Sequence, residues 1–254
     1  MSVILKSSAF LIRRFPYSET SLILHAFTRS YGKIALIAKG ARRPNSKFLG
    51  HFEPFQQIEL VFYKNDSREL QIVSESTIVR SFPEIQKDVQ KYSLASWILE
   101  LVHRILPEND PHPQLFDAMT DTFNGIGQTG EHGLNYLLKL IIVLFQETGF
   151  QLNFEKCGIC KKELGEEETY FNIPEGQLNC KTCQNQNRSG RNLRLAETIY
   201  LKNISRHPFS ELEKFSLPSP LEPEIIQNLI HYISYHFDYF KKFSSVDLWY
   251  QTQK

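Results

Sequence analysis

All four cysteines of the chain fall into two C-x-x-C pairs, Cys157 with Cys160 and Cys180 with Cys183, and nineteen residues separate the pairs. A tight turn in each pair lets two thiolates reach one metal ion. Two such pairs supply the four sulfurs of a tetrahedral zinc site. Because a four-thiolate site leaves no open coordination position, we predict one structural Zn²⁺ and seek the function of the chain elsewhere.

Two disulfides or a redox-active pair are the alternatives for these cysteines. Disulfides persist in oxidising compartments, but Lys6 interrupts the apolar N-terminal stretch and no small-residue cleavage site follows it. A thioredoxin-like pair would need a βαβ pattern around it, which the sequence lacks. The longest apolar run, Leu140 to Phe145, is too short to span a bilayer. We therefore expect a cytoplasmic protein with no membrane partner.

The near-neutral net charge of +1 hides an asymmetry along the chain. Residues 1–80 hold twelve Lys and Arg against six Asp and Glu, whereas the remainder holds seventeen against twenty-two. Between Lys6 and Lys47, nine basic residues face the single acid Glu19. This pattern indicates a polyanionic partner for the N-terminal region.

The densest basic stretch runs from Lys39 to Lys47 and contains Arg42 and Arg43. Its Gly and Pro residues indicate a loop, and cations on a loop can follow a phosphate backbone. Nearby aromatic residues could stack on unpaired bases. The candidates are Phe15, Tyr17, Tyr31, Phe48 and Phe52. For any single one of them a place in the core is the better interpretation, because a small barrel needs most of its aromatic residues there.

Short runs of β-branched and aromatic residues predict the element that carries this loop. Five strands are expected within about eighty residues, and they indicate a small closed or nearly closed barrel. The predicted strands are 3–13, 21–28, 33–39, 55–63 and 69–79.

After Pro83 the apolar spacing becomes helical. Helices are predicted from Tyr92 to Leu106, Leu115 to Phe123, Leu134 to Thr148, Leu193 to Ile204 and Pro223 to Phe240. We therefore predict an α+β chain in four segments: a barrel over 1–80, a helical domain split between 81–150 and 190–254, and a four-cysteine segment inserted at 151–189.

Two sequence regions resemble the RecO family of bacterial DNA repair and recombination mediators. Thr28 to Lys33, Ala38 to Arg43 with Ser46, and Phe52 to Phe55 are similar to the N-terminal signature of that family. Leu144 to Leu152, leading into Cys157 and Cys160, is similar to its later signature. The likeness extends over essentially the whole chain and is specific in these two regions.

The resemblance implies that the barrel is an OB-fold that binds single- and double-stranded DNA. It also implies annealing of strands coated with single-strand binding protein, and loading of RecA together with RecR. By position, the residues implied to contact the DNA backbone are Lys39, Arg42, Arg43 and Lys47, followed by Arg14, Arg29 and Lys33.

Our first hypothesis is therefore a DNA-binding mediator that is not an enzyme. An RNA-binding module made of an OB-fold and a zinc knuckle would share the same charge pattern and stays open as the alternative. A metal-dependent nuclease or deaminase would need a carboxylate cluster or an open zinc site, and the sequence displays neither.

Overall fold

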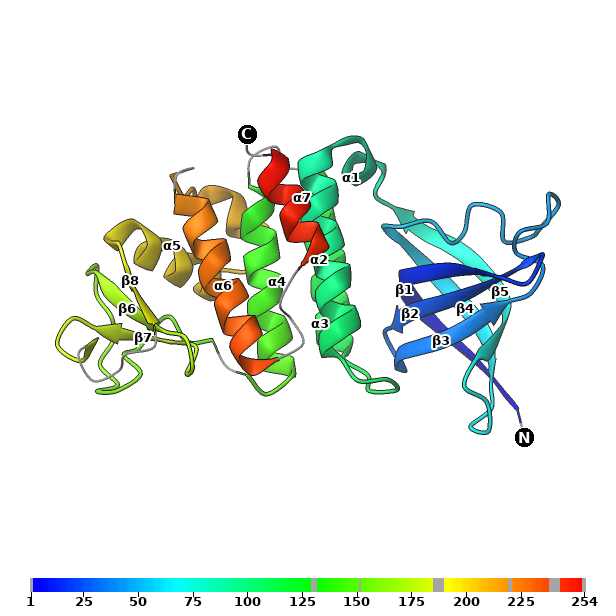
Figure 1. The fold of residues 1–254 in the computed structure, drawn as a ribbon, viewed down its shortest axis with the longest axis horizontal. Helices are drawn as coiled ribbons and strands as arrows, with labels where there is room; N and C mark the ends of the chain where they lie inside the picture. Colours follow the sequence, from blue (N-terminus) through cyan, green and yellow to red (C-terminus); the bar gives the residue numbers. More distant parts are fainter. Residues whose placement is uncertain are drawn as a thin grey trace. The chain divides into compact units, whose positions relative to one another are not determined.

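The computed structural model describes residues 2–128, 132–150, 152–184, 190–218, 221–237 and 243–252. It confirms the α+β class: a five-stranded sheet comes first, and helices follow it (Figure 1). Internal contacts group the chain into two compact units, Met1–Gln128 and Thr129–Lys254. The division into four segments remains a prediction. The last predicted helix reaches Phe240, which lies outside the described residues.

The first unit begins with five strands that close into a barrel in the order β1-β2-β3-β5-β4. Neighbouring strands are antiparallel except β3 and β5, which pair in parallel at Leu36 with Gln71 and Ile37 with Ile72. Inward-facing residues such as Leu24, Leu36 and Leu60 are fully buried. All five predicted strands are confirmed: β1 (Val3–Tyr17), β2 (Ser21–Thr28), β3 (Gly32–Ala38), β4 (Gln56–Lys64) and β5 (Gln71–Ser81).

Strand β1 is longer than predicted because it continues past Arg13 to Tyr17. Pro16 lies opposite Leu22 in this extension, where it can donate no backbone hydrogen bond. The extension matters because it carries Arg14, Phe15 and Tyr17 into the antiparallel pair with β2.

Three helices complete the first unit: α1 (Pro83–Lys87), α2 (Val89–Ile105) and α3 (Pro113–Gln128). The α3 helix packs aromatic rings on the barrel strands. Phe116 lies 4.9 Å from Phe10 and 5.8 Å from Phe27, measured between ring centroids. All three rings are buried, so the barrel and α3 share one apolar core.

The turn between β2 and β3 is fixed by its own side chains. The backbone N–H of Tyr31 donates to the Thr28 hydroxyl, which in turn donates to the Gly32 carbonyl. Gly32 has a φ of +68°, and a Cβ built there would lie 2.1 Å from the Asp110 carbonyl oxygen. Glycine is therefore required for two reasons: the left-handed backbone and the close approach of the loop that follows α2.

The second unit combines helices with a small sheet. Its helical elements are α4 (Gly133–Glu147), α5 (Leu195–Arg206), the 3₁₀ helix η2 (Phe209–Lys214), α6 (Glu222–His236) and α7 (Ser244–Thr252). The buried amide of Asn135 on α4 donates to the carbonyls of Leu212 and Phe215 and accepts from the Tyr200 hydroxyl. This one side chain therefore links α4, α5 and the end of η2.

A three-stranded antiparallel sheet, which the sequence did not predict, begins in the four-cysteine segment and ends just after it. Its strands are β6 (Thr169–Asn172), β7 (Gln177–Cys180) and β8 (Gly190–Leu193), in the order β7-β6-β8. The sheet is attached to α5 by a hydrogen bond of 2.8 Å between the hydroxyls of Thr169 and Thr198. Among the described residues, no helix combines the length and the apolar character needed to cross a bilayer.

We predict that Gly32→Ala destabilises the first unit more than Gly50→Ala does. Both glycines have positive φ, but a Cβ at Gly50 meets no atom within 4 Å. Gly50→Ala should lower the free energy of unfolding by about 1–2 kcal/mol through backbone strain alone. Gly32→Ala should lower it by a further ~1–3 kcal/mol because the methyl group overlaps Asp110. Urea unfolding followed by circular dichroism measures both, and equal losses would contradict the packing at Gly32.

Candidate nucleic-acid interface and metal centre

The segment from Lys39 to Phe55, which we call the basic loop, joins β3 to β4. Some of its own apolar side chains anchor it in the barrel core. Ala41, Phe48 and Phe52 are buried in the barrel core, and the Phe48 and Phe52 rings lie 5.4 Å apart. Successive turns hold the backbone: Arg43 N–H donates to the Gly40 carbonyl, and Ser46 N–H donates to the Arg43 carbonyl. The loop therefore has a defined conformation on the surface of the barrel.

The four cations expected on this loop all point to solvent. Lys39, Arg42, Arg43 and Lys47 are exposed, and within the described part of the chain none of them forms an ion pair with a carboxylate. The ammonium of Lys47 lies 5.3 Å from the centre of the Phe48 ring. The Ser46 hydroxyl accepts from the Phe48 N–H, and its own proton remains free to donate. Four charges held close together in this way would attract phosphate.

Arg14 joins this surface, although it has an acidic partner. Its guanidinium donates to the Phe52 carbonyl at 2.9 Å and to the Glu53 carboxylate at 2.6 Å. Arg14 and Arg42 both line a hollow of about 350 Å³ between the end of β1 and the basic loop. The structure thus brings together five of the seven cations that the sequence singled out.

Arg29 and Lys33 lie apart from the basic loop, and both have internal partners. The Arg29 guanidinium forms two hydrogen bonds of 2.9 and 2.8 Å with Asp117 on α3, which lower the pKa of that carboxyl. Lys33 is only 8% exposed and donates to the His103 carbonyl at 2.7 Å. Burial lowers its pKa. These contacts favour a structural role for both side chains, so phosphate contact by either one stays an untested prediction.

The five candidate stacking aromatics divide into two groups. Phe48 and Phe52 are buried, and Tyr31 packs edge-on against Phe62 at 5.8 Å. Phe15 and Tyr17 are 45% and 48% exposed. The core interpretation is therefore confirmed for Phe48 and Phe52. Tyr31 is partly buried against that core, and the other two rings remain accessible.

Arg13 is a further exposed cation, which composition and motif spacing did not single out. It lies opposite His25 in the β1–β2 register, on the strand face that carries Phe15 and Tyr17. Burial, together with the positive charges of Arg13 and Lys33, lowers the pKa of the neighbouring His103 to about 4. The alternation of β1 was the available signal, since it places residues 13, 15 and 17 on one face.

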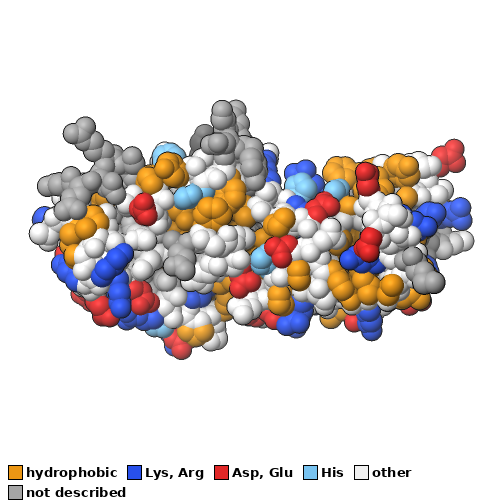
Figure 2. Space-filling model, turned by 90° about the horizontal axis from the view of Figure 1, so that it is seen from below, with side chains coloured by type: hydrophobic (Ala, Val, Ile, Leu, Met, Phe, Trp, Pro, Cys, Tyr) orange, Lys and Arg blue, Asp and Glu red, His pale blue; other side chains and the backbone are white. Residues whose placement is uncertain are grey.

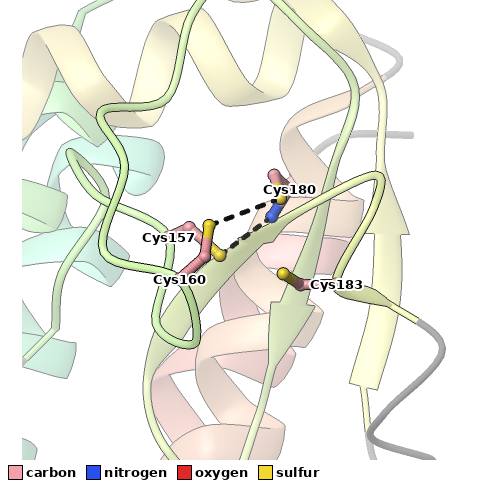
Figure 3. A group of neighbouring side chains, drawn as sticks. All are labelled: Cys157, Cys160, Cys180 and Cys183. Carbon is pink, nitrogen blue, oxygen red and sulfur yellow. Dashed lines mark hydrogen bonds between the residues drawn. The ribbon is translucent and has the colours of Figure 1, made fainter.

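The four cysteine sulfurs converge in the second unit. All lie within 4.8 Å of one another, and the sulfurs of Cys160 and Cys180 are 3.9 Å apart (Figure 3). Cys157 and Cys160 come from a turn in which Lys161 N–H donates to the Cys157 carbonyl. Cys180 ends β7, and Cys183 N–H donates to the Cys180 carbonyl in the second turn.

This geometry fits the predicted metal. Zinc–sulfur bonds of about 2.3 Å in a tetrahedron require sulfurs separated by about 3.8 Å. The Cys180 N–H donates to the Cys157 sulfur at 3.4 Å, as backbone groups do around metal-bound thiolates. Burial raises the pKa of Cys157, but the backbone N–H groups of Cys180, Cys160 and Ile159 outweigh it and lower the pKa to about 6. At Cys157 the backbone therefore favours the thiolate form that binds metals. At Cys183, hydrogen bonding with Cys180 and burial raise the pKa to about 12 when no metal is bound.

Comparison with known proteins gives the same family over both units. The family descriptions "Recombination protein O N terminal" and "Recombination protein O C terminal" match residues 1–82 and 86–243. A protein of Caldanaerobacter subterraneus subsp. tengcongensis named DNA repair protein RecO is 27% identical over 238 residues, which cover 92% of this chain and 93% of that protein.

A second relative, from Syntrophus aciditrophicus and also named DNA repair protein RecO, is 32% identical over 185 residues, covering 70% of this chain and 69% of the relative. The matched regions include the basic loop and the four cysteines. The chain therefore belongs to the RecO family, as its two sequence signatures indicated, and a role in DNA repair follows from that membership.

Proposed function

We propose that the chain is a DNA-binding recombination mediator that makes and breaks no covalent bond. The observation that carries the proposal is a group of four exposed cations on a loop anchored in the barrel core. None of the four pairs with a carboxylate of the described residues. The strand order β1-β2-β3-β5-β4 supports an OB-fold, a barrel that binds oligonucleotides in many proteins. Both single- and double-stranded DNA are expected ligands, because phosphate contacts do not depend on base sequence.

The chemistry of this surface suits strand annealing. Two complementary strands repel each other through their phosphates, and a surface that neutralises phosphates on both lowers that repulsion. We expect the protein to anneal strands coated with single-strand binding protein and to help RecR load RecA, in the cytoplasm. These partners follow from the family resemblance.

We also propose that the cysteine cluster is a structural zinc site. One Zn²⁺ bound by Cys157, Cys160, Cys180 and Cys183 would fix the sheet β6–β8 to its turns. A closed site with four protein ligands offers no position for a reacting water or substrate. The metal therefore supports the fold in this proposal and has no catalytic task.

We predict that Arg42→Gln with Arg43→Gln weakens DNA binding to a similar extent for all base sequences. The logarithmic salt dependence should flatten by roughly 0.7 per lost contact on single strands, because fewer counterions are released. Fluorescence anisotropy over a salt series measures this slope. Lys6→Gln with Lys87→Gln is the control of equal charge, since both lysines are paired with acids at 2.7 and 2.9 Å. An unchanged slope in the arginine variant would rule out the basic loop as the phosphate site.

The annealing activity itself is tested with complementary oligonucleotides coated with single-strand binding protein. We expect the wild-type chain to speed duplex formation and the double arginine variant to lose most of that acceleration. The control pair Lys6→Gln with Lys87→Gln should retain it. If the wild-type chain binds DNA but leaves the annealing rate unchanged, the mediator function is wrong even though DNA binding stands.

Removal of the metal should damage folding more than DNA affinity. We expect one zinc per chain, and we expect Cys157→Ser to release it and lower the melting temperature of the second unit, because metal-binding free energy is folding free energy in such sites. Lys181→Ser is the control, since this exposed residue lies inside the second pair and is not a ligand. A stable, zinc-free Cys157→Ser protein that no longer binds DNA would show that the knuckle binds DNA directly.

A further inference from the structure

Two aromatic rings on β1 stay exposed although the barrel buries most others. Phe15 and Tyr17 are 45% and 48% exposed. Directly opposed residues of an antiparallel pair share a face, so Phe15 lies beside Ile23, and Tyr17 beside Ser21, on the outside of the barrel. Leu24, opposite Arg14, is fully buried and marks the inner face. Hydrophobic side chains reach the surface over the barrel close to Lys and Arg (Figure 2).

One contact steadies the first of these rings. Phe15 packs edge-on against His25, with 5.9 Å between the ring centroids. His25 packs in turn against His103 of α2 at 5.8 Å. The Phe15 ring is therefore positioned by its neighbours, while nearly half of the side chain remains open to solvent.

The second ring adjoins the basic loop. Ser18, which follows Tyr17, has a left-handed φ of +54°, and its carbonyl accepts from the Arg42 guanidinium at 3.3 Å. The Arg42 N–H donates to the Thr20 carbonyl at 2.8 Å. Two hydrogen bonds thus hold the cationic loop beside the turn that ends β1. The cationic loop therefore lies next to the strand end that carries Tyr17.

The spacing of the rings selects the form of nucleic acid that fits. Alternate residues of a strand are about 6.6 Å apart, roughly twice the 3.4 Å rise of a stacked nucleic-acid strand. Bases stacked on one another therefore cannot meet both rings, whereas two bases separated from each other can. Duplex DNA keeps its bases stacked, and a single strand can open them.

We infer that Phe15 and Tyr17 form a stacking platform for two unpaired bases of a single strand whose phosphates bind the basic loop. Arg13, on the same face, adds a cation beside the platform. The inference rests on the proposed DNA-binding function and deepens it, because it assigns the preference for single strands to two named rings. Phosphate contacts then serve both forms of DNA, and stacking serves one of them.

The test replaces both rings, as Phe15→Leu with Tyr17→Leu, in the full-length chain. Leucine keeps the exposed apolar character and removes the aromatic face. We expect the dissociation constant for a single-stranded oligonucleotide to rise about 5- to 150-fold per lost stack. Binding of duplex DNA and the salt slope should not change. A single strand containing 2-aminopurine should lose fluorescence on binding the wild type, through stacking, and retain it with the variant.

Tyr63→Leu is the matched control. Tyr63 is 37% exposed on β4 and lies opposite Ile4, near the other end of β1. This variant should bind both forms of DNA as the wild type does. Melting temperatures of all three proteins verify that each one is folded.

The outcomes separate this inference from the function on which it rests. If the ring variant binds single strands normally while the Arg42 and Arg43 variant does not, the platform is wrong and the DNA-binding function stands. The same result is expected if the two rings bind a partner protein and make no contact with DNA. Equal losses on single strands and duplex would mean that the rings only support the loop, which overturns the platform. If the wild-type chain binds no DNA, the proposed function fails and the platform fails with it.

Discussion

The candidate interface depends on one interaction: three apolar residues of the basic loop, Ala41, Phe48 and Phe52, are buried in the barrel core. Four like charges within nine residues repel one another, and an unsupported loop would spread them apart. Burying two phenylalanine side chains contributes about 1.5–3 kcal/mol each, which offsets that repulsion. The apolar side of the loop thus holds its cations in place before any ligand arrives, and a surface ordered in advance loses less entropy on binding.

The cysteine segment and its sheet are too small to be stable without additional interactions. Its sheet has three strands of four residues each, and so small a sheet cannot supply a sufficient core of its own. Contacts with the helices of the second unit supply part of the stability. The ring centroids of Phe171 and Tyr232 on α6 are 6.4 Å apart, and the Thr169 hydroxyl is hydrogen-bonded to that of Thr198 on α5. Of the four cysteines on the turns of this segment, three are buried and Cys160 is exposed. A bound ion would hold these turns together, in agreement with a structural role for the metal.

Periodicity made the five strands and the main helices predictable, because apolar alternation and helical spacing are local properties. The β6–β8 sheet escaped because four-residue strands such as Thr169–Asn172 show too little alternation. The cysteine cluster followed from spacing alone, since the chain has no other cysteine. Composition could not separate Lys33 from Lys39: both are lysines of the same region, but only the fold turns one toward the His103 carbonyl and the other toward solvent.

Composition likewise could not tell the buried aromatic residues from the exposed ones. The exposed rings matter because they bear on how a DNA-binding protein can distinguish single strands from duplex. Phosphate contacts alone favour whichever form presents more charge, and duplex DNA carries twice the charge density of one of its strands. A protein that relied on Arg42 and Arg43 alone would therefore be drawn to duplex, which is the product of annealing. A preference for the unpaired substrate needs a short-range interaction that duplex cannot make. Phe15 and Tyr17 can supply it, because their exposed rings can stack on unpaired bases. They also lie close to the basic loop, since Arg42 donates to the carbonyl of Ser18, the residue after Tyr17.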